Sequence, residues 1–284
     1  MEGEALIMEI QEMIGMKQKF CNYARLAFMM MALSLILGCS SGGTPPPAPP
    51  AIPDTQQTVN RALEISYLRL AMDTSLVRWA SIEACCLSSL RKTAPNNDSC
   101  LGFRVYQGQD TVNNGIRAEA SCDFPFIAGD SVVYQWQLFL ASDFDSTMPA
   151  NTWCIVGQWH DQPDTAQGET WAAHPAMSPP VSINYGPLNG SDCLGLRYGA
   201  WPVINDIGTF PIVRNRWLKL TVEIRWSQGN NGSIRLFLDD TLQLTAVGPN
   251  MNNSFRHYFK FGMYRHAAIP SDNWIYLRGL TIVK

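Results

Sequence analysis

Hydrophobic and polar residues alternate over long parts of the chain after residue 100. In 132–140 every second position carries a large apolar side chain, and two of the intervening positions are glutamines. In 218–226 apolar residues again take every second position, with Lys, Thr, Glu and Arg between them. Successive side chains of a strand point to opposite faces, so both stretches predict β-strands that bury one face.

Turn-forming residues separate these stretches. Gly-Asn-Asn-Gly at 229–232 predicts a hairpin turn before a strand at 234–238, and Asp239-Asp240 leads into another strand at 242–247. A last strand is expected at 274–283. Many short strands without helical patterns between them indicate an all-β fold, an antiparallel β-sandwich.

The segment 56–92 does not favour one type of element. Its apolar residues fit both a strand and a helix, because periodicity does not separate the two over short runs. We expect a mixed region with an N-terminal strand at about 76–80.

The stretch 257–265 predicts a strand whose two faces differ in chemistry. One face would pack into the core with Phe259, Phe261 and Met263. The other face would carry polar groups and a gap, from Tyr258, Lys260, Gly262 and Tyr264. Such a face suits a bulky acidic ligand, although an ordinary solvated strand face is the alternative.

Two shorter motifs repeat this arrangement. In Gln158-Trp159-His160 the polar residues share one face and Trp159 takes the other, and in Arg117-Ala118-Glu119 the two charged residues share a face. Three separate strands would thus each present ionisable or amide groups at alternate positions. We interpret the set as one site.

These motifs, in this order, resemble those of the β-jelly-roll polysaccharide lyases. Arg-x-Glu, Gln-x-His and Tyr-Phe-Lys-x-Gly-x-Tyr are similar to the motifs of heparin lyase I, glucuronan lyase and the related alginate lyases, over about 100–284. The resemblance implies a jelly-roll, concanavalin-like sandwich with an open cleft on one sheet. It also implies β-elimination of a uronic-acid glycan (glucuronan, heparin- or heparan-like, or alginate) to a 4,5-unsaturated product. No cofactor would be required, and a structural calcium ion is left open.

The resemblance implies a role for each matching residue. Tyr264 would donate a proton to the leaving oxygen, and His160 would take the C5 proton, or Tyr264 would do both for the other epimer. Gln158 and Arg117 would neutralise the substrate carboxylate. The remaining candidates are expected to bind substrate or to support these groups: Lys260, Tyr258, Glu119 (which would orient Arg117), Arg265 and Trp159.

Several other histidines and arginines have a structural or surface role as the alternative to a role in the site. His174, His257 and His266 are expected to be structural, and Arg214, like Arg265, either contacts an acid group or lies on the solvated surface. The irregular stretch that follows His160, through about residue 180, is expected to line the cleft. Ala120 and Trp159 replace residues typical of alginate lyases, which leaves the substrate undecided.

Composition adds limits rather than a function. The formal net charge is −3, which gives no general affinity for nucleic acid, so any attraction for an acidic polymer must be local. The length allows one large β domain, and we expect a monomer.

The N-terminal region predicts export. Basic residues at 17–25 precede the apolar run 26–37, and Ile-Leu-Gly-Cys at 36–39 resembles a bacterial lipobox with Cys39 as the lipidated residue. A transmembrane anchor is the alternative, but the run is too short to span a bilayer. We therefore expect a signal peptide at 1–39, with Met16 as the start, a proline-rich linker at 40–56 and a lyase domain at 57–284. The protein would be a lipoprotein of the outer membrane, cell surface or periplasm.

Six cysteines remain outside the predicted signal peptide, and their number fits an exported chain. An even number favours disulfides, and the expected pairs are Cys85 or Cys86 with Cys100, and Cys154 with Cys193; Cys122 is the sixth. No Cys-x-x-Cys pair has a matching second pair, so no zinc or other metal site is expected.

Two other functions compete with the lyase. A retaining glycoside hydrolase needs two carboxylates about 5–5.5 Å apart, commonly from Glu-x-Asp-x-x-Glu, which the sequence lacks. A non-catalytic carbohydrate-binding lipoprotein with a lectin-like sandwich would need exposed aromatic residues, but not the Gln, His, Lys and Tyr set.

Overall fold

The computed structural model describes residues 54–284. The predicted signal peptide, the candidate lipidation site Cys39 and residues 40–53 of the predicted linker lie outside the described residues. Within 54–284, no helix combines the length and the apolar character needed to cross a membrane.

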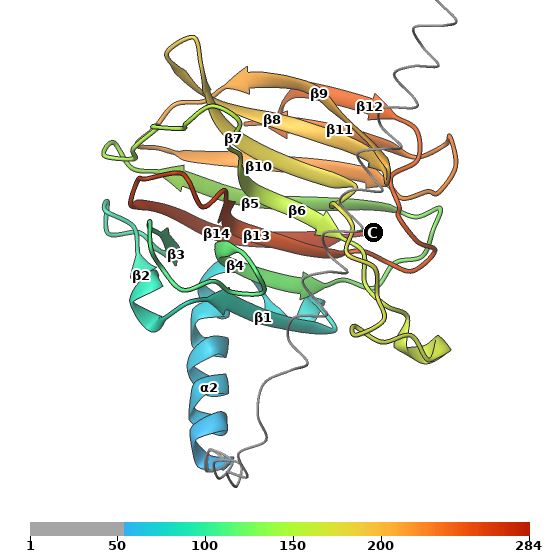
Figure 1. The fold of residues 1–284 in the computed structure, drawn as a ribbon, viewed down its shortest axis with the longest axis horizontal. Helices are drawn as coiled ribbons and strands as arrows, with labels where there is room; N and C mark the ends of the chain where they lie inside the picture. The colour runs from blue at the N-terminus through green and yellow to red at the C-terminus, as the bar shows by residue number, and fades with distance from the viewer. Residues whose placement is uncertain (1–53) are drawn as a thin grey trace, which may run out of the picture. The chain divides into compact units, whose positions relative to one another are not determined.

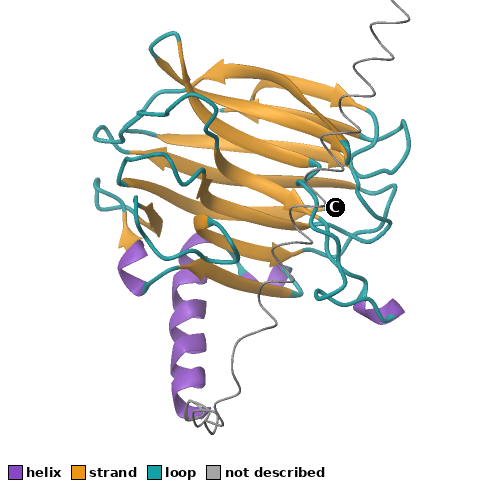
Figure 2. Cartoon of the chain, viewed as in Figure 1, coloured by secondary structure: helices purple, strands orange, loops and turns teal. Residues whose placement is uncertain are grey.

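Strands are the main secondary structure of the described chain (Figure 2). In chain order the elements are α2 (Asp54–Ala71), η1 (Thr74–Leu76), β1 (Trp79–Ala84), η2 (Leu87–Ser89), β2 (Leu90–Thr93), β3 (Ser99–Val105), β4 (Ile116–Asp123), β5 (Ser131–Leu140), β6 (Cys154–His160), η3 (Thr165–Gln167), β7 (Val181–Leu188), β8 (Ser191–Ala200), β9 (Val203–Pro211), β10 (Trp217–Arg225), β11 (Ser233–Leu238), β12 (Thr241–Val247), β13 (Tyr258–Arg265) and β14 (Asn273–Val283).

The strands form two seven-stranded antiparallel sheets (Figure 1). The first sheet, which we call the cleft sheet, has the order β1-β4-β13-β6-β7-β8-β9, and the second has the order β12-β11-β10-β5-β14-β3-β2. The predicted antiparallel sandwich is confirmed. In the cleft sheet, β13 lies between β4 and β6, so the three motif strands are direct neighbours.

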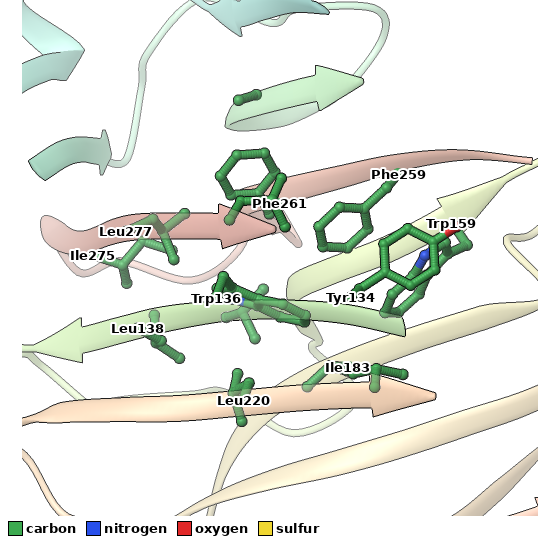
Figure 3. Close-up of a cluster of buried hydrophobic side chains, with 14 of the residues drawn as sticks. Tyr134, Trp136, Leu138, Trp159, Ile183, Leu220, Phe259, Phe261, Ile275 and Leu277 are labelled. Atoms are coloured by element: carbon green, nitrogen blue, oxygen red, sulfur yellow. The ribbon is translucent and has the colours of Figure 1, made fainter. Parts of the chain in front are cut away.

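Aromatic side chains fill the space between the sheets (Figure 3). Phe259 of β13 stacks on Trp159 of β6 with ring centroids 4.6 Å apart. Tyr134 and Trp136 of β5 in the second sheet meet Phe259 at 5.3 and 5.1 Å. Burial of such side chains stabilises the fold by roughly 1.5–3 kcal/mol each, and it fixes which face of β13 points away from the core.

The ambiguous N-terminal segment is a helix followed by a strand. In α2, Tyr67, Leu68 and Ala71 are buried on one face, at the three- and four-residue spacing of a helix. The expected strand at 76–80 instead begins at Trp79 and runs to Ala84. Helix α2 also starts at Asp54, inside the predicted linker.

Helix α2 covers the free edge of β1, the outermost strand of the cleft sheet. Glu64 accepts a hydrogen bond from the Ile82 backbone N–H at 2.6 Å, and Arg61 donates to the Ala80 carbonyl at 3.0 Å. Unpaired edge strands invite association with other chains. The helix therefore occupies part of this edge and holds β1 in place.

The predicted disulfides are wrong, because all six cysteines of the described region are free. Cys154 and Cys193 lie on β6 and β8, which β7 separates, and two strand spacings of about 4.8 Å exceed the reach of a disulfide. Cys100 packs with Phe139 and Tyr276 on the second sheet, whereas Cys85 and Cys86 follow β1 of the cleft sheet.

Candidate active site

The face of the cleft sheet that points away from the core forms the floor of a cleft of about 1170 Å³. All four residues expected to be catalytic line it, and two of the expected substrate-binding residues do so as well: Arg117, Gln158, His160, Tyr264, Lys260 and Tyr258. The sequence-derived site is therefore one continuous surface across β4, β13 and β6.

Strand register sets the order of these groups along the floor. Tyr264 lies opposite Arg117 of β4 and Ile155 of β6. Three pairs of neighbours follow one another along β13: Arg117 with Tyr264, Gln158 with Lys260, and His160 with Tyr258. His160 and Tyr264 thus approach the middle of the floor from opposite ends, with Gln158 between them.

Tyr264 is held between a cation and an indole. The Arg117 guanidinium carbon lies 3.9 Å from the centre of the Tyr264 ring, and Trp153 meets the ring edge-on at 4.6 Å. Cation–π contact and aromatic packing both restrict the ring. Trp153, which no sequence motif pointed to, comes from the segment before β6 and lines the same cleft.

Glycines let the site strands and Tyr264 approach closely. Gly262 has φ +149°, and a Cβ there would lie 2.4 Å from the Ala118 carbonyl oxygen. A Cβ on Gly115 would lie 2.5 Å from Cε2 of Tyr264. Residue 262 must therefore be a glycine, because a side chain there would collide with the backbone of β4, which pairs with β13.

Glu83 of β1 is a central site residue that the sequence analysis missed. Its carboxylate lies 2.6 Å from Lys260 Nζ and 3.5 Å from Arg117 Nη1, and it accepts hydrogen bonds at 2.9 Å from both Asn113 and Ser121. Burial raises the pKa of Glu83, but the Lys260 ammonium and these hydrogen bonds outweigh burial and lower it below its ordinary value. Glu83 is therefore a carboxylate that neutralises Lys260. The alternation of Trp79, Ser81 and Glu83 could have suggested it.

Glu119 supports the site from below. It is 1% exposed and does not line the cleft, so it does not reach a substrate there. It accepts a hydrogen bond from the Gln158 amide at 2.7 Å and lies 3.4 Å from Arg117 Nη1. Burial raises the pKa of its carboxyl. Glu119 orients both neighbours, including Arg117 as expected.

Trp159 and Arg265 do not belong to the cleft, and the expectation that they contact substrate is wrong. Trp159 is fully buried on the core face. Arg265 is 2% exposed and donates hydrogen bonds to the Ser271 hydroxyl and carbonyl. Arg214 is likewise taken up by an ion pair with Asp192 at 2.6 Å.

The segment after His160 lines the cleft, as predicted, with Trp171, Met177, Ser178 and Pro179. It begins with Asp161, whose carboxylate lies 3.1 Å from His160 Nδ1 and 2.6 Å from His174 Nε2. His174 therefore ties this segment to the strand that carries His160.

The other two histidines have local roles, as expected. His257 is 1% exposed, and burial lowers its pKa to about 4. His266 accepts a hydrogen bond from the Ala268 backbone N–H. Within 54–284, no cluster of three or more His, Cys, Asp or Glu side chains is placed to hold a metal ion.

Comparisons with known proteins agree with this architecture. A family model described as polysaccharide lyase matches residues 76–280. An endo-β-1,4-glucuronan lyase from the fungus Trichoderma reesei has a similar structure, with a TM-score of 0.51 and 13% identity, covering 72% of this chain and 94% of that one. Alginate lyase A1-II', a member of polysaccharide lyase family 7, is similar with a TM-score of 0.50 and 12% identity, covering 70% of this chain and 84% of that one.

At these identities the two structures support the fold alone, and no curated protein matched the sequence. The family match spans most of the chain, including all the strands that build the cleft floor. The resemblance predicted from the three motifs is confirmed, and the chain belongs to the polysaccharide lyase family.

Proposed function

We propose that the protein cleaves an unsulfated uronic-acid polysaccharide by β-elimination and leaves a 4,5-unsaturated sugar at the new end. The observation that carries this proposal is the convergence of Arg117, Gln158, His160, Lys260 and Tyr264 on one cleft floor. A carbohydrate-binding protein would need the aromatic residues of this cleft but not its acid–base groups.

The reaction removes a weakly acidic proton from C5 of the uronic acid. Arg117 and Gln158 would hydrogen-bond the adjacent carboxylate and stabilise the negative charge that develops in the transition state. Tyr264 would protonate the C4 oxygen as it leaves, and His160 would accept the C5 proton.

The position of the sugar would depend on its epimer. A substrate that needs both His160 and Tyr264 would sit over Gln158, midway between them. One that needs only Tyr264 as acid and base would sit nearer Arg117. Loss of His160 would therefore affect the two kinds of substrate unequally.

The charges of the cleft favour a substrate of low charge density. Among the described residues, three lysines or arginines line the cleft, and each has a carboxylate within 3.5 Å: Arg117 with Glu83 and Glu119, Lys260 with Glu83, and Arg197 with Asp206. Sulfate groups carry a permanent charge that calls for unpaired cations. The paired cations suit isolated carboxylates better than the dense charge of heparin.

The test is incubation of the purified protein with glucuronan, alginate, the unsulfated backbone of heparin, heparin itself and chondroitin sulfate. The ultraviolet absorbance of the unsaturated product should rise with an unsulfated polyuronate and rise least with heparin. Binding to one of these glycans without any new absorbance would instead favour the carbohydrate-binding function.

We further propose that the protein is exported and anchored by a lipid on Cys39, with the proline-rich segment as a spacer. The basic residues, apolar run and lipobox-like tetrapeptide of the N-terminal sequence support this. Expression in a bacterium with labelled fatty acid should label the wild type and not Cys39→Ser.

The proposed chemistry needs only side chains, so a chelator should leave the rate unchanged. A loss of thermal stability in the chelator, reversed by calcium, would reveal the structural ion left open above. Size-exclusion chromatography would test the expected monomer.

A further inference from the structure

Asp161 holds a buried carboxylate at the junction between the catalytic floor and the segment that lines it. It is 0% exposed, and three side chains converge on it. His160 Nδ1 lies 3.1 Å from Oδ1, His174 Nε2 lies 2.6 Å from Oδ2, and the Asn252 amide donates to Oδ1 at 3.0 Å. Asn252 also donates to the Ser178 carbonyl, so the same group ties three segments together.

The surroundings of His160 determine which ring nitrogen carries the proton. Besides the carboxylate oxygen, Nδ1 lies 3.2 Å from the backbone carbonyl oxygen of Asp161. An ionised carboxylate and a carbonyl only accept hydrogen bonds, so Nδ1 must be the donor. Burial raises the pKa of Asp161, but hydrogen bonds from His160, Asn252 and His174 outweigh burial and lower it well below its ordinary value.

The neutral imidazole has one donor and one acceptor nitrogen. With the proton on Nδ1, the lone pair is on Nε2. The ring lines the cleft, and within 54–284 no hydrogen-bond partner occupies Nε2. Nε2 is therefore the nitrogen of this cleft-lining ring that is left to accept a proton.

We propose that Asp161 is a positioning residue that fixes His160 as the Nδ1–H tautomer, with Nε2 as the group that accepts a proton from substrate. His174 occupies the other carboxylate oxygen, so the orientation of His160 and the placement of the cleft-lining segment depend on one side chain. The tautomer follows from the contacts alone, whereas its use as a base rests on the proposed function.

Replacement of Asp161 by asparagine makes this idea testable. The amide keeps the shape but offers one acceptor oxygen and one donor nitrogen, while the carboxylate serves two imidazole donors. In Asp161→Asn, at least one of His160 and His174 must therefore change tautomer. A change at His160 reports the positioning of that ring, whereas a change at His174 alone reports only the tether of the segment.

Nitrogen NMR of protein labelled with ¹⁵N-histidine reads these tautomers directly, and the chain has only four histidines. At pH 8, where an ordinary imidazole is neutral, the wild type should show Nδ1–H for His160 and Nε2–H for His174. His257 and His266 provide internal references. The first donates from Nδ1 to the Phe255 carbonyl and accepts at Nε2, and the second accepts at Nδ1.

Asp161→Asn should change the tautomer of His160, with or without a change at His174, and leave the two reference histidines unchanged. His174→Gln should leave His160 as Nδ1–H. The matched control is Asp164→Asn, which removes a carboxylate that caps η3 in the same segment and should change no tautomer.

Activity on a cleaved polyuronate gives the second readout. Asp161→Asn should lower kcat at least tenfold with little change in KM, as expected when a catalytic imidazole loses its orienting carboxylate. Added to His160→Ala, it should lower kcat no further, because the two act as one unit.

An Nε2–H tautomer for His160 in the wild type would overturn the proposal, as would an Asp161→Asn protein in which His160 keeps Nδ1–H. The wild-type measurement needs no variant, so it stands even if Asp161→Asn does not fold. The predicted tautomers in a protein that cleaves no polyuronate would support the positioning by Asp161 and refute the proposed function.

Discussion

The two sheets of the sandwich treat their outward faces differently. In the second sheet, β5 and β10 alternate between buried and more exposed positions almost without interruption, as expected for a strand with one solvated face. In the cleft sheet, β4, β6 and β13 are buried on both faces along nearly their whole length. The outward groups of these strands are nevertheless polar.

Ion pairs between strands of one sheet show the same contrast. On the second sheet, Arg235 and Glu223 meet at 2.9 Å with side chains 53% and 38% exposed. On the cleft sheet, Lys260 and Glu83 meet at 2.6 Å with side chains 5% and 15% exposed. Partly desolvated charges interact more strongly and are costly to leave unpaired. The contrast between the two pairs indicates that the buried ion pair of the cleft sheet serves function, whereas the exposed pair of the second sheet serves solubility.

The largest difference should appear in activity when one hydroxyl is removed from each sheet. Tyr264→Phe should lower kcat by about 10²–10⁴-fold, because it removes the proposed acid. Tyr276→Phe, on β14 of the second sheet, should stay within about twofold of wild type, because it is distant from the cleft. Initial rates of product absorbance measure both, and equal losses would contradict the assignment.

The two ion pairs should differ in stability. Glu83→Gln leaves Lys260 and Arg117 without their shared carboxylate and should lower the free energy of unfolding by about 3 kcal/mol. Glu223→Gln, in the exposed pair, should lower it by less than about 0.5 kcal/mol. Urea unfolding followed by tryptophan fluorescence measures both values. Similar small losses would mean that the cleft pair is solvated.

Close approach of β4 and β13 should make the backbone of the cleft sheet sensitive to one methyl group. Gly262→Ala should destabilise the protein by about 1–3 kcal/mol, because the residue has a positive φ and its Cβ would overlap the Ala118 carbonyl. Gly186→Ala, on β7 of the same sheet, meets no atom within 4 Å and should have little effect. Thermal unfolding of the two variants gives the comparison, and equal shifts would argue against the close approach.

Acid should reduce the stability that the buried Lys260–Glu83 pair contributes. The pKa of Glu83 is lower in the folded state than its ordinary value. Its contribution is therefore complete above the unfolded pKa of about 4.3 and is lost as the pH falls through the folded value. The stability difference between wild type and Glu83→Gln should be constant from pH 7 to about 5 and shrink below about pH 4. A constant difference down to pH 3 would contradict this.

Alternation made the second sheet predictable from the sequence. The expected strands at 132–140, 218–226 and 234–238 match β5, β10 and β11 within one residue at each end. The outward faces of these strands are solvated and polar, so apolar and polar residues alternate clearly along the sequence. The secondary structure of segment 56–92 could not be assigned from the sequence, because α2 and β1 bury only short apolar runs.

The site itself was partly predictable. Parity along β13 placed Lys260 and Tyr264 on the cleft face, and the same parity puts Arg265 with Phe259 and Phe261 on the core face. The alternation along β13 therefore argued against Arg265 as a site residue, although it was proposed as one. Glu83 was missed because its importance depends on the pairing of β1 with β4, a contact between distant segments that local periodicity does not report.

The order of strands in the cleft sheet also has a consequence for biosynthesis. Residues 258–265 insert between strands that end at positions 123 and 160, so the catalytic floor has a gap until the ribosome has made residues 258–265. Contacts between such distant segments form slowly. A prematurely terminated product that ends before β13 would have β4 and β6 but lack both Lys260 and Tyr264. Degradation of the glycan thus requires synthesis at least through Tyr264.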